Sequence, residues 1–155
     1  MLICCMNYRL FTGMVRWLPS SRDYWYSITL LIVLIGNLIG IMFISLISSF
    51  SIEIVNAAEL ICLKFINELW YIVLFKGILC GLCITAACQA YHFDGGYIIT
   101  FLMVMIFVFC GMRHCIADAY YLSVSGMWAA GLLNWLCIVI GNVIGGVIPT
   151  LFEGN

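Results

Sequence analysis

Charged residues are scarce in this sequence. Asp, Glu, Lys and Arg make up 8% of its 155 residues, whereas 66% are hydrophobic and the mean hydropathy is +1.19. A water-soluble domain of this size could not keep such a surface solvated, so a soluble fold is excluded. The net charge of −1 provides no basic face, which excludes nucleic acid as a partner. We therefore predict an all-α integral membrane protein that has the lipid bilayer as its surroundings.

The usual signatures of catalysis are missing as well. The sequence has no Ser/His/Asp arrangement and no glycine-rich phosphate loop, so we do not expect an enzyme. Cys80 and Cys83 form a C-x-x-C pair, but no second pair or histidine stands at metal-ligand spacing. Most of the nine cysteines lie inside apolar runs, where a thiol packs as a small hydrophobe. No metal site and no cofactor are predicted.

What the sequence does contain is long apolar runs. A helix that crosses a bilayer needs about 20 such residues. The runs Trp25 to Phe50, Leu69 to Tyr91 and Met127 to Phe152 meet that length and are predicted to be spans.

The remaining organisation follows from these runs. Residues 1–13 are too short to cross and are expected to be the end of a broken span whose beginning is absent. Residues 14–50 are read as a cytoplasmic loop followed by a span, and residues 51–155 as a second unit of three spans. Arg16 and Arg22 favour the cytoplasm for their loop, which puts the C-terminus in the cytoplasm too.

One apolar run is interrupted by polar residues. Gly111, Arg113, His114 and Asp118 fall where a simple membrane helix would carry only apolar side chains, and ionisable groups at that depth cost several kcal/mol. A backbone break in lipid is tolerated only inside protein or along a watery cavity. The pattern predicts a permeation or binding site on a discontinuous helix. Arg113 could pair with Asp118 or contact substrate, and the pairing, which would stabilise the break, is favoured.

The chain also contains an internal repeat. GNLIG and GNVIGG each follow a polar interruption by a similar distance. Both are small-x-x-x-small patterns, which allow two helices to approach closely. Gly36, Gly40, Gly141 and Gly145 are therefore expected to mediate helix packing. Copies in opposite orientation would bring two broken helices together at the bilayer midplane.

Five ordered motifs resemble the formate/nitrite transporter family. They are LFTG at residues 10–13, GNLIG at 36–40, KGILCGL at 76–82, GMRHCIAD at 111–118 and GNVIGG at 141–146. The resemblance implies an aquaporin-like inverted repeat of three plus three spans, a homopentamer with one pore in each protomer, and a plasma (inner) membrane location. Against that pattern the first span and most of the second are missing, so we expect an N-terminally truncated member.

The resemblance also implies a pathway for small monovalent weak-acid anions. His114 falls at the central pore histidine, and Thr12 at the threonine of the loop that interrupts the second span. The other matched positions are the constrictions and the vestibule, namely Leu10, Phe107, Ile84 and Lys64. A neutral imidazole at such a point could exchange a proton with a weak acid.

Departures from the family pattern leave alternatives open. Gly81 stands where the family usually has Asn, Arg113 where Glu is common, and Asp118 where Asn is common. His114 could instead be satisfied by a backbone carbonyl at the break. The chain as a whole could be a non-conducting truncated fragment, or a pore for neutral solutes.

Overall fold

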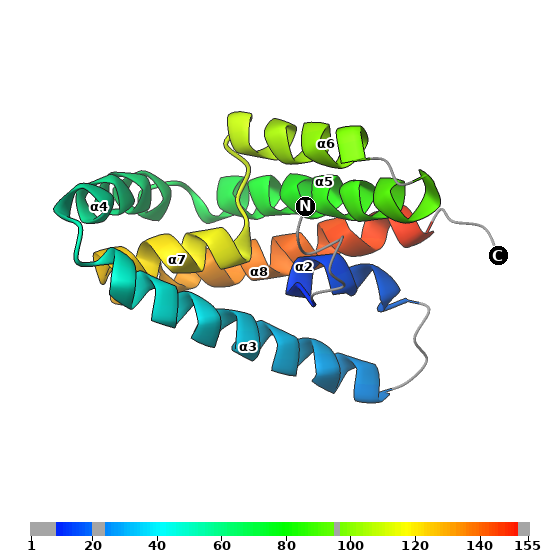
Figure 1. The fold of residues 1–155 in the computed structure, drawn as a ribbon, viewed down its shortest axis with the longest axis horizontal. Coiled ribbons are helices and arrows are strands. Elements are labelled where there is room, and N and C mark those ends of the chain that lie inside the picture. Colours follow the sequence, from blue (N-terminus) through cyan, green and yellow to red (C-terminus); the bar gives the residue numbers. More distant parts are fainter. Residues whose placement is uncertain (1–8, 20–23, 95–96, 152–155) are drawn as a thin grey trace.

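A computed structural model describes residues 9–19, 24–94 and 97–151 of the chain. Within these ranges the regular structure is helical (Figure 1). Three helices are long and apolar enough to cross a membrane: α3 (Tyr24–Ser48), α5 (Trp70–Asp94) and α8 (Trp128–Leu151). The predicted all-α membrane class is therefore confirmed.

Shorter helices connect and flank these three. A single turn, α2 (Phe11–Met14), continues into a 3-10 turn over Val15–Trp17. The helix α4 (Ile52–Ile66) joins α3 to α5. The predicted interrupted span consists of two separate pieces, α6 (Tyr97–Phe109) and α7 (Cys115–Ser125). Neither piece is long enough to cross a bilayer alone.

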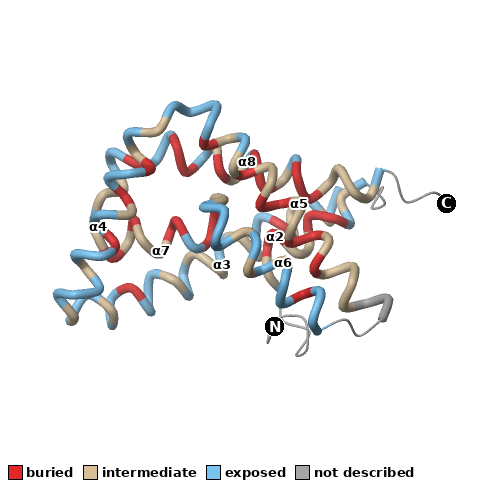
Figure 2. The backbone as a smooth tube through the Cα atoms, turned by 90° about the horizontal axis from the view of Figure 1, so that it is seen from above, coloured by how far each residue is buried: buried red, intermediate tan, exposed pale blue. Residues whose placement is uncertain are grey.

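The helices α5 and α8 form the most closely packed part of the fold. They lie side by side in Figure 1, and Figure 2 shows buried residues gathered along both. A Cβ added at Gly141 would lie 2.6 Å from the Leu74 carbonyl oxygen, and one at Gly145 would collide with the Ile78 carbonyl. The two backbones therefore touch, as small residues at regular spacing allow.

The glycines of the first repeat copy are placed differently. Gly36 and Gly40 lie on an exposed face of α3, and a Cβ at either position would meet nothing within 4 Å. Only 11% of the residues in the most apolar 18-residue stretch of α3 are buried. Within the described chain these two glycines therefore do not mediate the close helix contact that the sequence predicted.

Two segments are more ordered than the sequence indicated. The first part of residues 51–68 was expected to be an outer loop and the rest a helix, but α4 is continuous from Ile52 to Ile66 and buries Ala58, Cys62 and Phe65 along one face. Their spacing of four and three residues is typical of an amphipathic helix. Arg16 was placed in an aqueous loop, but it is buried in the 3-10 turn, which contacts α8.

Candidate functional site

The site is built around the gap between α6 and α7. The chain leaves α6 at Phe109 and turns at Gly111, whose φ of +64° is accessible to glycine at little cost. Helical structure resumes at Cys115, with His114 in an extended conformation just before it. The break lies where the polar residues of the sequence predicted it.

Asn142 of α8 holds the backbone on both sides of His114. Its side chain is fully buried, and its Oδ1 accepts a hydrogen bond of 2.9 Å from the Cys115 N–H. Its Nδ2 donates to the carbonyls of Arg113 and Gly77, both at 2.9 Å. We call this arrangement, an asparagine bonded to the residues before and after one extended residue, the amide clamp. It satisfies polar groups that the break would otherwise leave unpaired.

A second amide clamp stands at the other repeat copy. Asn37 of α3 accepts a hydrogen bond from the Phe11 N–H at 3.1 Å and donates to the Arg9 carbonyl at 3.3 Å. The residue between is Leu10, which is extended and precedes α2 as His114 precedes α7. Leu10 and His114 are thus equivalent positions. In Figure 1, α2 and α7 run from the middle of the molecule in opposite directions, as an inverted repeat requires.

The imidazole of His114 has a defined orientation. Its Nδ1 accepts a hydrogen bond of 3.3 Å from the Ala117 N–H and so caps the first turn of α7. Its Nε2 lies 3.1 Å from Oγ1 of Thr12, which is fully buried. Because Nδ1 is an acceptor, a neutral ring carries its proton on Nε2 and donates it to Thr12. One side chain from each copy thus meets the other at the centre of the fold.

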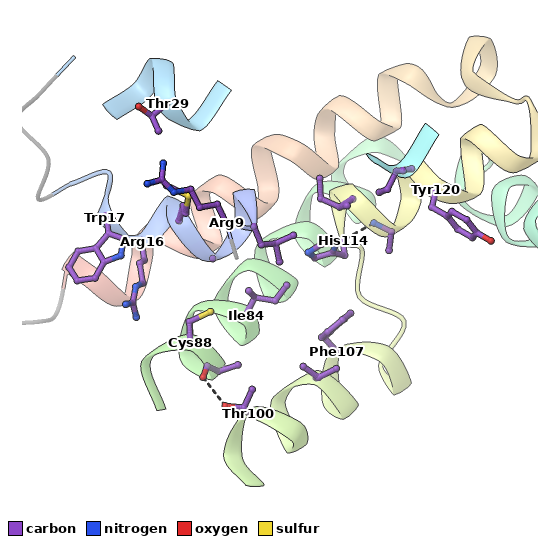
Figure 3. Close-up of a pocket in the computed structure, with 18 of the residues that line it drawn as sticks. Arg9, Arg16, Trp17, Thr29, Ile84, Cys88, Thr100, Phe107, His114 and Tyr120 are labelled. Carbon is purple, nitrogen blue, oxygen red and sulfur yellow. Dashed lines mark hydrogen bonds between the residues drawn. The ribbon is translucent and has the colours of Figure 1, made fainter. Parts of the chain in front are cut away.

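A cavity of about 890 Å³ opens beside this contact. It is lined by residues of α2, α3, α5, α6 and α7, and Figure 3 shows His114 on one side of it. The predicted constriction residues Leu10, Phe107 and Ile84 all line it, and the Phe107 ring centroid lies 6.1 Å from that of His114. Lys64 does not, because it is exposed on α4. Five of the six predicted pathway residues are thus brought together.

The cavity lining contains cations that sequence reasoning missed. Arg9 and Arg16 line it, and no Asp or Glu is among the described residues around it. Arg16 had been assigned to a loop because a proline and serines follow it. Its position four residues after Thr12, one helical turn on, is the signal that could have placed it at the cavity.

Arg113 and Asp118 form a pair behind the break. The Arg113 Nη1 donates to Asp118 Oδ1 at 3.0 Å, and Asp118 is 3% exposed. Glu68, which sequence reasoning missed, lies 3.9 Å from the Arg113 Nε and also pairs with Lys76. None of these side chains lines the cavity. The favoured pairing of Arg113 with Asp118 is therefore present, and each charge has an opposite partner.

Gly81 has a packing reason for lacking a side chain. A Cβ there would collide with the Asn142 carbonyl and lie 2.9 Å from the Gly146 nitrogen. The position belongs to the α5–α8 contact and is not part of the cavity wall. An asparagine would fit at Gly81 only if the two helices separated.

Over residues 9–19, 24–94 and 97–151 no group of three or more His, Cys, Asp and Glu side chains could hold a metal ion. A comparison with protein-family models matches residues 1–152 to the family described as formate/nitrite transporter. A comparison with curated proteins finds no match.

Proposed function

The chain belongs to the formate/nitrite transporter family, and from this membership we propose that it carries formate, nitrite or similar weak-acid anions through a pore within each protomer. The observation that carries the proposal is the contact between His114 and Thr12. It joins the two repeat copies beside a cavity that is lined by two arginines and, among the described residues, by no carboxylate.

Dehydration is the main obstacle for such an anion. Moving a carboxylate-sized ion from water into an apolar passage costs many kcal/mol unless polar groups replace the lost water. Leu10, Phe107 and Ile84 make part of the passage apolar, which excludes hydrated ions. The N–H on Nε2 of His114 can exchange its hydrogen bond to Thr12 for one to the bare anion, and the N-terminus of α7 presents the positive end of its dipole there.

Proton exchange at His114 requires an additional step. A weak acid that gains a proton loses its charge and most of the solvation penalty. The ring can give up a proton and stay neutral only if Nδ1 has first been protonated, and Nδ1 accepts the Ala117 N–H. A relaying imidazole therefore has to release the first turn of α7. Hydrogen-bond donation and proton relay thus make different demands on the side chain.

Three substitutions separate these roles. Gln at position 114 keeps an N–H near the place of Nε2, Asn keeps an acceptor near the place of Nδ1, and Phe keeps neither. We expect His114→Phe to lower formate uptake into reconstituted vesicles by about tenfold or more, since that is the effect on rate of losing a hydrogen bond to a charged group. Retained uptake in His114→Gln, with loss in His114→Asn, indicates donation. Loss in all three indicates relay.

Two further outcomes are decisive. Unchanged uptake by His114→Phe would contradict the central role of this residue. No uptake by the wild-type chain would reject transport and favour the alternative, a non-conducting member of the family. Micelle elution volume and helical circular dichroism serve as folding controls for each variant.

Family membership also supports a location and an assembly. We propose a plasma (inner) membrane protein with a cytoplasmic C-terminus that associates as a homopentamer. The exposed apolar face of α3, which includes Gly36 and Gly40, is available to lipid or to a neighbouring protomer.

A further inference from the structure

Arg16 is a buried cation that has no acidic partner among the described residues. Arg16 is 8% exposed, and its guanidinium carbon lies 4.5 Å from the centroid of the Trp17 ring. In the part of the chain that the structure describes, no ion pair joins Arg16 to an Asp or a Glu. A buried charge is normally paired, because desolvation is costly. The position of Arg16 therefore indicates a partner that is not a side chain of these residues.

The cavity gives that partner a place. Arg16 lines it together with Arg9, and Figure 3 shows both arginines and Trp17 on the side opposite His114. Some of the other polar lining groups are already engaged, since the hydroxyls of Tyr26 and Thr100 donate to backbone carbonyls. The two guanidinium groups are thus the cationic donors among the described lining residues, and a bound anion can reach them from the cavity.

The chemistry of the guanidinium group indicates which class of anion it would bind. Its planar fork of N–H donors matches the two oxygens of a planar anion, which it binds through two parallel hydrogen bonds. An aromatic ring against a guanidinium stabilises the cation and restricts its orientation. Carboxylates and nitrite have two oxygens in one plane, whereas chloride and hydrosulfide offer a single atom.

We propose that Arg16, oriented by Trp17 and assisted by Arg9, forms a binding site for planar two-oxygen monovalent anions at the end of the cavity away from His114. This inference deepens the proposed function. Binding of the anion at Arg16 does not depend on transport, and only its later passage past His114 rests on the proposed function. The site would select formate and nitrite over chloride and hydrosulfide before the anion reaches His114.

Anion binding can be tested without transport. We would titrate ¹³C-formate into the full chain in detergent micelles and follow the line width of its NMR signal. Arg16→Gln is expected to weaken formate binding by about tenfold or more, because it removes a charge-assisted pair of hydrogen bonds. Arg16→Lys keeps the charge but not the fork, so it should lose most of the preference for formate over chloride.

Controls separate the site from general charge effects. Lys76→Gln removes the same charge from a residue outside the cavity that pairs with Glu68, and it should bind formate as the wild type does. Arg16→Lys also serves as the test variant if Arg16→Gln does not fold. Nitrite should displace formate, whereas chloride and an anionic phospholipid should not.

Several results would overturn the proposal. These are unchanged formate binding in Arg16→Gln, an unchanged preference in Arg16→Lys, or displacement by anionic phospholipid instead of nitrite. Vesicle uptake measured in parallel distinguishes the two proposals. Binding that depends on Arg16, in a wild-type chain that transports nothing, would support this site and reject the proposed function.

Discussion

Removing the side chain of Asn142 is the most informative perturbation of the fold. Asn142→Ala would break three hydrogen bonds of 2.9 Å and leave the Cys115 N–H and the Arg113 and Gly77 carbonyls without their partner. A buried polar group left unpaired costs about 1–3 kcal/mol, so three such groups would cost roughly 3–9 kcal/mol. Hydrogen bonds between membrane helices average only about 0.6 kcal/mol, which sets a lower bound of about 2 kcal/mol.

Asn37 provides the matched comparison within the same chain. Its clamp has two hydrogen bonds, at 3.1 and 3.3 Å, and it lies on a largely exposed helix. By the same average, Asn37→Ala should cost about 1 kcal/mol. Asn142→Asp is a second comparison because it keeps the shape and can still accept from the Cys115 N–H. It should be nearly as damaging as alanine, since an oxygen would then face two carbonyls.

The assay is unfolding of the full chain by sodium dodecyl sulfate in mixed micelles. Circular dichroism reports the helices, and the emission of the five tryptophans reports tertiary packing, to which Trp135 contributes at the start of α7 because its indole donates to the Cys115 carbonyl at 2.8 Å. We expect the unfolding free energy to fall by at least about 2 kcal/mol in Asn142→Ala, and by less in Asn37→Ala. Equal losses in the two variants, or none in Asn142→Ala, would refute the reasoning.

Two further predictions concern packing and charge, and each is measured by unfolding in micelles. Gly145→Ala should lower stability, because its Cβ would collide with the Ile78 carbonyl and separate α5 from α8. Gly36→Ala, which meets nothing within 4 Å, should be neutral or stabilising by up to about 1 kcal/mol, and equal losses in both would contradict the packing argument. Asp118→Asn should cost about 3 kcal/mol because it leaves Arg113, whose side chain is 11% exposed, short of a partner, whereas Glu59→Gln on the exposed face of α4 should cost little. An Asp118→Asn variant as stable as the wild type would mean that Glu68 alone neutralises Arg113.

The break itself could be predicted from the sequence. Ionisable residues at Arg113, His114 and Asp118 stand in an apolar run, and the free energy of placing them in lipid leaves few alternatives to an interrupted helix. The long spans follow from length and hydropathy in the same way. The contact of His114 with Thr12 needed the repeat and the family resemblance, because the two residues are 102 positions apart.

Other parts of the site could not be derived from those patterns. The glycines of GNLIG and GNVIGG suggested the same packing in both copies, but only Gly141 and Gly145 lie against another described helix. What the two copies share is the asparagine, whose amide was overlooked because it lies among apolar residues. Arg16 was read from its neighbours in the chain, whereas its burial is decided by α8, more than a hundred residues away.

The ring of His114 has two tasks that cannot be changed independently. Nδ1 caps the first turn of α7, and Nε2 contacts Thr12 of the other repeat copy. A substitution of His114 that is meant to change the transported anion would therefore first have to leave the fold intact. Most substitutions of His114 that still allow folding will keep its hydrogen-bonding groups. A changed anion preference is therefore better sought by substituting other residues that line the cavity.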